Sequence, residues 1–500
     1  MEGDSTLFDP PKGSLARSVG RGALATGGAQ AIRLACQFVS VIALSRLLAP
    51  DDFGIVAMAG PVLAFIGLFQ DLGLMQATIQ KKSITQGEVN ALFWINIGVS
   101  VLLMGVLILI APLAAQFYGE PAVGTLIVAM SVLTVVHAAA GQHHAILNRR
   151  MLFGRTAVVN SAAAVVGLAV SIAWAMADPS YWALYAGTVA TALTGTVTIW
   201  VISGWKPNVP RLVPGTSTLV RFGTGLTGYN FTSYFSRNLD IILIGRYWAE
   251  QQLGLYDRAQ KLLLFPLQQV TGPLGSVTVP ALSRMTDQPH RYRHAYARVA
   301  SIILMTTLPG VAVAIAMADV LVPFALGEQW KGSALIFQAL GFAGLMQSLN
   351  SPSGWLFISQ GRSMELMRWG VVSAAISVTA FVIGLPYGAF GVAMAYAVSE
   401  YLRTPLLWLY VGRTGPVRTR DVTRMGLPFL LGAHLALGII LIIKPHLPQQ
   451  PLPALILAAM LSYLLVASFA ALFPAGRQAL NEVRVLLSQR MPLLAKGRRA

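Results

Sequence analysis

Basic side chains interrupt several of the most apolar stretches of this 500-residue chain. Arg33 lies in GGAQAIRLACQF, Arg237 in YFSRNLD, and both Arg258 and Lys261 in LYDRAQK. If these stretches cross a membrane, a charge at the bilayer centre costs about 2.5–3.5 kcal/mol, so each residue is expected to face a cavity or a partner. Arginine offers phosphate oxygens a planar fork of donors, and lysine offers a compact charge. The four cations therefore predict a cavity that binds an anion.

Local ion pairing is the alternative interpretation for most of these cations. Residues three or four apart lie on one face of a helix, so Arg237 can neutralise Asp240, and Asp257 can neutralise Lys261. The sequence offers Arg33 no local acidic partner, which favours a role in the cavity. For the other three cations both interpretations stay open.

Carboxylates inside the apolar stretches suggest a second kind of chemistry. Asp71 and Asp240 are candidates for a coupling-ion site, because intramembrane carboxylates often relay protons. Glu400 and Arg403 are three residues apart near the inner end of an apolar stretch, and a local ion pair is the favoured interpretation. We expect neither a metal site nor a cofactor.

The composition is that of a membrane protein. Hydrophobic residues make up 55% of the chain and charged residues 11%, whereas a soluble domain carries about 25% charged residues. A helix needs about 20 apolar residues to cross the hydrocarbon, and the runs lack the alternation of a barrel. An all-α integral membrane fold with fourteen spans is predicted, at 22–48, 52–74, 87–112, 122–147, 153–177, 181–203, 217–247, 251–281, 294–318, 333–358, 364–386, 389–411, 423–444 and 453–474.

The distribution of Lys and Arg orients these spans. With the N-terminus in the cytoplasm, 27 of the 36 basic residues fall in inner loops and tails and 4 in outer loops, which is the positive-inside pattern. We therefore expect both termini in the cytoplasm. The strong net charge of +17 is explained without nucleic acid as a partner.

A short pattern occurs twice, 200 residues apart. IALSRLLAPDDFG at 42–54 and ILIGRYWAEQQLG at 242–254 share an isoleucine, an arginine, an alanine and a glycine. A second, weaker repeat is formed by IAPLAAQFYGEP at 110–121 and VLVPFALGEQW at 320–330. The two copies of the first pattern are six spans apart, so they point the same way and predict a duplicated six-helix lobe.

The repeated residues themselves have a plainer interpretation. Arg46 and Arg246 end spans at the outer interface, where an arginine can extend into the headgroups, so a gate or an interface anchor is favoured over a substrate ligand. Ala49 and Gly54 are expected to allow a tight outer turn, and Pro50 to break the first helix.

The repeat also predicts the division of the chain. The expected parts are a cytoplasmic tail (1–21), an N-terminal six-helix lobe (22–203), an inter-lobe loop (204–221), a C-terminal six-helix lobe (217–411), two further transmembrane helices (423–474) and a basic cytoplasmic tail (475–500). The two lobes would be related by a pseudo-two-fold axis along the membrane normal.

The segments SRLLAPDDFGIVAMA, FQDLGLMQATIQ and APLAAQFYGEP resemble the polysaccharide-transporter family of Wzx-type flippases, within the multidrug/oligosaccharidyl-lipid/polysaccharide exporter superfamily. The resemblance covers about 20–412 and is densest at 43–121. It implies a MATE-like fold and a transporter, not an enzyme, that moves an undecaprenyl-diphosphate-linked oligosaccharide across the bacterial inner membrane for exopolysaccharide or lipopolysaccharide O-antigen. Alternating access, driven by an ion gradient or the membrane potential, is the implied mechanism. The implied partners are membrane lipids, the lipid-linked oligosaccharide, a polysaccharide polymerase and export machinery.

Three other functions stay open. A lipid-linked peptidoglycan precursor flippase also has fourteen spans and a cationic cavity. A multidrug or cation antiporter of the same superfamily usually has twelve spans and an anionic cavity. A membrane-embedded polysaccharide polymerase is expected to carry a long extramembrane loop, and the loops of this chain are short.

Overall fold

The computed structural model describes residues 15–70, 73–81, 83–210, 216–474, 476–477 and 480–481, and within them it contains helices, turns and bends but no strand. The chain divides into two compact units, Met1–Gly254 and Leu255–Ala500. Ten stretches of the described residues are long and apolar enough to cross a membrane. One of these stretches, Ser363–Val411, holds two helices.

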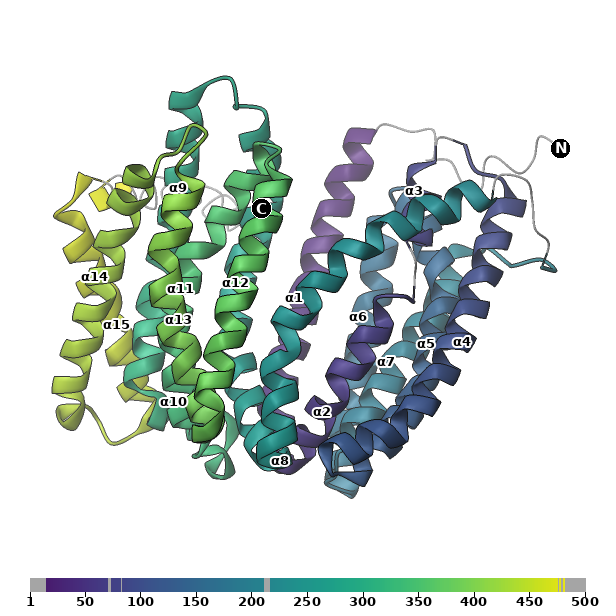
Figure 1. Cartoon of the computed structure of the whole chain (residues 1–500), viewed down its shortest axis with the longest axis horizontal. Helices are drawn as coiled ribbons and strands as arrows, with labels where there is room; N and C mark the ends of the chain where they lie inside the picture. The colour runs from purple at the N-terminus through teal and green to yellow at the C-terminus, as the bar shows by residue number, and fades with distance from the viewer. Residues whose placement is uncertain are drawn as a thin grey trace, which may run out of the picture. The chain divides into compact units, whose positions relative to one another are not determined.

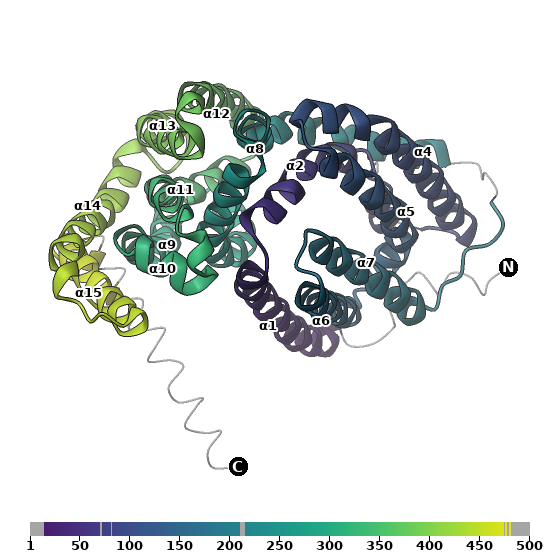
Figure 2. The same ribbon diagram turned by 90° about the horizontal axis from the view of Figure 1, so that it is seen from below.

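Unit 1, the Met1–Gly254 part, is a bundle of long helices (Figures 1 and 2). Helix α6 packs on both α1 and α7, and α5 packs on α2, α4 and α7. The helices are α1 (Leu15–Leu47), α2 (Pro50–Gly67), α3 (Leu74–Gln80), α4 (Gln86–Tyr118), α5 (Pro121–Arg149), α6 (Phe153–Ala177), α7 (Trp182–Ser203) and the first part of α8 (Thr216–Ser283).

Unit 2, the Leu255–Ala500 part, is built around α11, which packs on α9, α10, α12 and α13 (Figure 2). Helices α14 and α15 pack on α9 and on each other. After the end of α8 the helices are α9 (Pro289–Ala316), α10 (Ala318–Leu326), α11 (Ser333–Ser359), α12 (Ser363–Gly384), α13 (Gly388–Val411), α14 (Thr419–Ile443) and α15 (Pro451–Ala471), with short 3-10 turns at Glu328–Trp330, Leu385–Tyr387 and Lys444–His446.

Each expected span coincides largely with helix, and the arrangement differs at four of them. The span at 52–74 is α2 followed by the short α3, and α10 follows the span at 294–318. The spans at 217–247 and 251–281 are joined in α8, where the expected outer loop is reduced to a single break at Ala249 (φ 60, ψ −178). The division into two lobes at 204–221 stays a prediction.

Helix α11 explains why hydropathy alone understates the number of helices. It is not among the ten apolar stretches, since it carries polar residues such as Gln347, Ser348 and Asn350 along its length. Most of its side chains are nonetheless buried. A helix surrounded by other helices can carry polar groups that lipid would not tolerate, because its neighbours supply hydrogen-bond partners.

The segment FYGEP at the end of α4 is a helix stop followed by a helix start. Gly119 ends α4 in the left-handed region (φ 75), which glycine adopts without strain. The carboxylate of Glu120 then accepts a hydrogen bond of 3.1 Å from the amide of Ala122, and Pro121 occupies the first turn of α5. One pentapeptide therefore fixes a tight connection between two spans.

The two glycines of the repeat lie at a reciprocal helix contact within unit 1. A methyl group at Gly54 would lie 1.9 Å from the carbonyl oxygen of Glu250, and one at Gly254 would lie 1.9 Å from the carbonyl oxygen of Pro50. The same two repeat positions make both contacts, because Gly54 corresponds to Gly254 and Pro50 corresponds to Glu250 in the 200-residue repeat. The expectation that Gly54 belongs to a turn is wrong: it lies inside α2, and only glycine permits this approach of the two backbones.

This contact predicts that Gly54→Ala and Gly254→Ala lower stability. The added methyl would displace backbone atoms, at a cost of about 1–3 kcal/mol for an overpacked site. Gly60→Ala is the matched control, because Gly60 lies in the same helix and a methyl group added there would meet no heavy atom within 4 Å. Thermal unfolding of the detergent-purified protein measures the difference, and equal midpoints for Gly54→Ala and Gly60→Ala would refute the assignment.

Candidate functional site

The cations of the LYDRAQK segment converge on one buried carboxylate in α8, shortly after the break at Ala249. Nη2 of Arg258 lies 3.0 Å from Oδ2 of Asp257, and Nζ of Lys261 lies 2.9 Å from Oδ1. The side chain of Asp257 is 3% exposed and that of Lys261 is 53% exposed. We call these three residues the α8 cluster. It carries two positive charges and one negative charge, so its net charge is +1.

Close packing of α8 on α11 fixes the α8 cluster in unit 2. The hydroxyl of Ser333 donates to the carbonyl of Leu255 at 3.0 Å. Gly344 lets the side chain of Leu263 approach α11, since a methyl group there would lie 3.3 Å from it. Tyr256 and Ala259 are fully buried on the same stretch. The helix is thus held on both sides of Asp257, and the carboxylate orients its two cations.

The two interpretations of these cations are therefore compatible in the structure. The expected i,i+4 pair between Asp257 and Lys261 is present. Because Arg258 joins the same carboxylate, pairing does not cancel the positive charge. The ability of the cluster to bind an anion stays a prediction.

The remaining predicted cavity residues are distributed differently. Arg33 is exposed on α1, and no ion pair involves it within the described part of the chain. Asp240 is buried in α8 (4% exposed). Asp71 and the side chain of Arg237 lie outside the described residues. A coupling role for either aspartate stays a prediction.

Both repeated arginines are exposed at helix ends. Arg46 lies in the last turn of α1. The guanidinium of Arg246 lies 5.6 Å from the ring centre of Phe117 and 5.9 Å from that of Tyr247. Arginine beside aromatic rings is typical of a membrane–water interface. The role of Arg46 and Arg246 as a gate or interface anchor stays a prediction.

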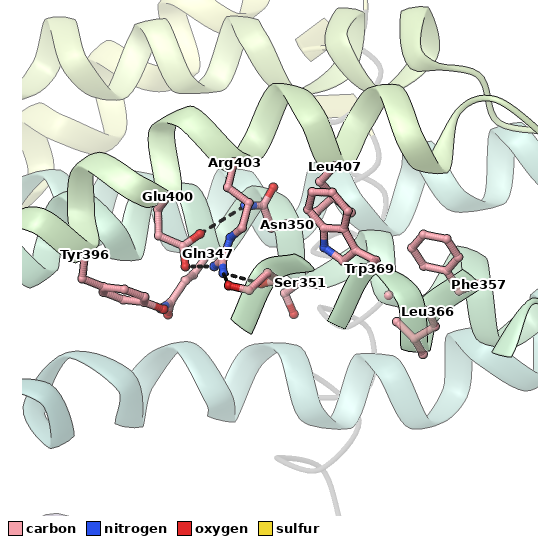
Figure 3. A pocket seen from close by; sticks show the side chains of 12 residues that line it. Gln347, Asn350, Ser351, Phe357, Leu366, Trp369, Tyr396, Glu400, Arg403 and Leu407 are labelled. Carbon is pink, nitrogen blue, oxygen red and sulfur yellow. Dashed lines mark hydrogen bonds and ion pairs between the residues drawn. The ribbon is translucent and has the colours of Figure 1, made fainter. Parts of the chain in front are cut away.

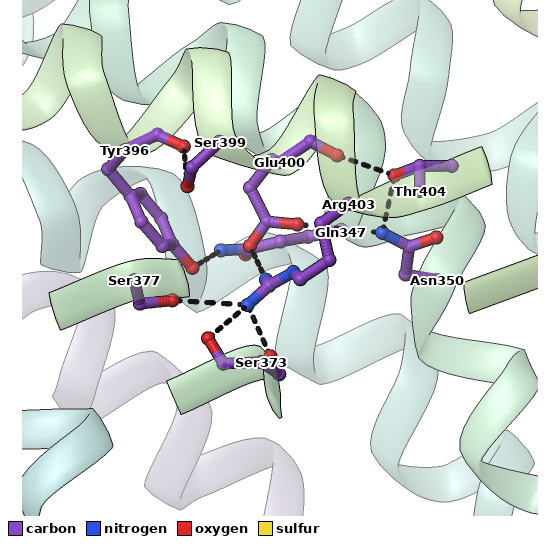
Figure 4. Close-up of polar contacts among 9 residues, drawn as sticks. All are labelled: Gln347, Asn350, Ser373, Ser377, Tyr396, Ser399, Glu400, Arg403 and Thr404. Carbon is purple, nitrogen blue, oxygen red and sulfur yellow. Dashed lines mark hydrogen bonds and ion pairs between the residues drawn. The ribbon is translucent and has the colours of Figure 1, made fainter. Parts of the chain in front are cut away.

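The expected pair between Glu400 and Arg403 is present, and it is part of a larger network in unit 2 (Figure 4). Arg403 donates to Glu400 and to Ser373 on α12, and to the hydroxyl of Ser377 at 3.1 Å. On the other side, the amide of Asn350 on α11 lies 3.5 Å from Glu400. The pair therefore joins α11, α12 and α13, a role that sequence spacing cannot show.

The same network forms one wall of a cavity of about 380 Å³ between these three helices (Figure 3). Sequence reasoning missed most of its lining, which comprises Gln347, Asn350, Ser351, Gly354, Phe357, Leu366, Trp369, Ser373, Tyr396, Glu400, Arg403 and Leu407. The available signal was the run of polar side chains on α11 at helical spacing, beginning with Gln347, Asn350 and Ser351. We call this space the unit 2 cavity.

Comparison with known proteins identifies the family. Residues 43–335, more than half of the chain, match the family model described as "Polysaccharide biosynthesis protein". The chain belongs to this family. The match includes the repeat, the FYGEP connection and the α8 cluster, so the most distinctive local features lie inside it.

Proteins with similar sequences come from several bacteria. The chain is 22% identical over 417 residues to the lipopolysaccharide biosynthesis protein WzxC of Escherichia coli, covering 81% of this chain and 84% of that one. It is 24% identical over 388 residues to the succinoglycan biosynthesis transport protein ExoT of Rhizobium meliloti, covering 77% of each.

Two solved structures show the same fold. The lipid II flippase MurJ, in an inward closed conformation, matches with a TM-score of 0.72 at 12% identity, covering 90% of this chain and 98% of that one. An inward-facing MATE multidrug transporter of the MOP superfamily matches with a TM-score of 0.59 at 13% identity, covering 81% and 95%. Together with the apolar helices, this identifies a multi-pass membrane protein with the MATE-like fold.

The Glu400–Arg403 pair predicts a non-additive effect on stability. Glu400→Leu or Arg403→Met alone leaves a buried charge without its partner, which costs about 3–5 kcal/mol, whereas the double variant removes both charges and should lose less than either single one. Asp319→Ala is the control, because its pair with Lys444 is exposed and should be worth about 1 kcal/mol or less. Thermal unfolding checks the cycle, and additive losses would contradict a buried pair.

Proposed function

We propose that this protein moves an oligosaccharide linked to a polyprenyl diphosphate from the cytoplasmic to the outer leaflet of a bacterial inner membrane. The family, the lipopolysaccharide and succinoglycan proteins that it resembles, and the fold it has in common with a lipid II flippase support this function. The product would supply exopolysaccharide or O-antigen synthesis, where a polysaccharide polymerase and export machinery are the expected partners.

The observation that carries the proposal is the net positive charge of the α8 cluster. A diphosphate headgroup loses its hydration when it enters an apolar protein, and buried cations with fixed hydrogen-bond donors offset that loss. Asp257 holds Arg258 and Lys261 on one face of the helix without cancelling both charges. The more exposed ammonium of Lys261 is the group that would contact the phosphate first.

The other charged residues complete the proposed transport path. Arg33 and Arg237 would contact the headgroup from α1 and from the first part of α8. Asp71 or Asp240 would take up the coupling ion, and exchange between two lobes, 22–203 and 217–411, would give alternating access with both termini in the cytoplasm. No step in this scheme makes or breaks a covalent bond, so a transporter is proposed and not an enzyme.

The rival functions differ in the charge or the substrate that they require. A positive cluster disfavours an antiporter for cationic drugs, because like charges repel. A peptidoglycan precursor also carries a diphosphate, so the α8 cluster suits it equally. Sequence similarity to proteins named for lipopolysaccharide and succinoglycan biosynthesis favours an exported polysaccharide as the destination.

Lys261→Gln is expected to slow transport by about tenfold or more, since a hydrogen bond to a charged group is worth about 1.5–3 kcal/mol. The measurement uses purified full-length protein in vesicles and a fluorescent polyprenyl-diphosphate tetrasaccharide, followed by accessibility to a quencher. Lys331→Gln removes an exposed cation just before α11 and should leave the rate unchanged. Wild-type transport by Lys261→Gln would remove the α8 cluster from the substrate path.

Arg33→Ala tests the contribution of α1 in the same vesicles. Because Arg33 makes no ion pair within the described residues, its loss should change transport without lowering the unfolding temperature. We expect a reduction of about tenfold from one lost contact with a phosphate. A wild-type rate with normal stability would show that Arg33 does not contact the headgroup.

A further inference from the structure

The unit 2 cavity has two chemically distinct halves (Figure 3). One half is lined by amide, hydroxyl and charged groups, including Gln347, Tyr396 and the Glu400–Arg403 pair. The other half is apolar and aromatic, with Trp369 and Leu407 facing it. Small-molecule sites commonly have this combination of apolar walls and a few converging polar groups, and volumes from about 300 Å³ upward.

The polar half carries no net charge. Glu400 and Arg403 neutralise each other, and the amide of Gln347 donates to the hydroxyl of Tyr396 at 2.9 Å. A phosphate at this wall would meet the carboxylate of Glu400, and a metal cation would meet the guanidinium of Arg403. Neutral hydroxyl groups fit better than either ion, because each can donate one hydrogen bond and accept others.

The aromatic half offers a rigid platform. The ring of Trp369 stacks on that of Tyr410, with centres 5.8 Å apart and planes at 26°. Tyr410 in turn lies 6.1 Å from the ring of Phe357, another lining residue. Trp369 is thereby held in one orientation, and its indole presents a flat apolar surface of the kind that packs on the C–H face of a sugar ring.

We propose that the unit 2 cavity binds one neutral pyranose residue of the transported oligosaccharide. The inference rests on the proposed function, since the sugar arrives on the lipid carrier. The α8 cluster would hold the diphosphate, and the cavity would replace water at the hydroxyl groups of one sugar. Leaving each such hydroxyl without a partner would cost about 1–3 kcal/mol, so the cavity would favour carriers loaded with a sugar that fits.

The test compares two probes in the same vesicles: a fluorescent polyprenyl diphosphate that bears a tetrasaccharide of neutral hexoses, and the same carrier without sugar. Trp369→Leu and Tyr396→Phe should each slow the sugar-bearing probe at least tenfold more than the sugar-free probe. Lys261→Gln should slow both probes to a similar extent. Trp174→Leu is the control, because Trp174 is an exposed tryptophan on α6 and should affect neither.

The outcomes separate the two proposals. If the wild-type protein moves neither probe, the proposed function fails. If it moves both, and Trp369→Leu and Tyr396→Phe slow the two probes equally or not at all, the sugar site is overturned while the function stands. Tyr396→Phe removes one hydroxyl and keeps the ring, so a selective loss in this variant supports the sugar site even if Trp369→Leu unfolds.

Discussion

A charged side chain inside a membrane protein is costly unless it faces a cavity or finds partners among its neighbours. The described parts of the chain satisfy this constraint in two ways. At Asp257, one carboxylate pairs with two cations, so the three residues together keep a net positive charge. At Glu400, one carboxylate serves one cation, and amides and hydroxyls from two other helices complete the arrangement. The first solution suits an anion, and the second suits a neutral ligand.

Both polar groups depend on how closely the helices of unit 2 pack. Ser333 and Gly344 allow α8 to lie against α11, and this contact orients the residues around Asp257. The helix α11 is buried enough to carry amide side chains, which then become available to α13. Small residues let the helices pack closely, and the close packing gives buried polar side chains the hydrogen-bond partners that lipid cannot provide.

The two copies of the repeat lie against each other within unit 1. The two glycines do not form turns but meet the start of each other's helix, with Gly54 against Glu250 and Gly254 against Pro50. Only backbone atoms make this contact, so it tolerates almost any change in the flanking side chains. Glycine is therefore required at both positions by the approach of the two backbones, whatever side chains flank it.

The sequence by itself determined the membrane class, most of the helical spans and the ion pairs Asp257–Lys261 and Glu400–Arg403, because these depend on local composition and on the period of a helix. It also yielded the family resemblance, through a run of turn and apolar positions. Only the tertiary structure decided what lies opposite each residue. The partners of Arg403 on α12, the carbonyl that requires Gly54, and the cavity between α11, α12 and α13 join residues far apart in the chain. A local sequence pattern cannot predict these contacts, because they depend on how whole helices pack against one another.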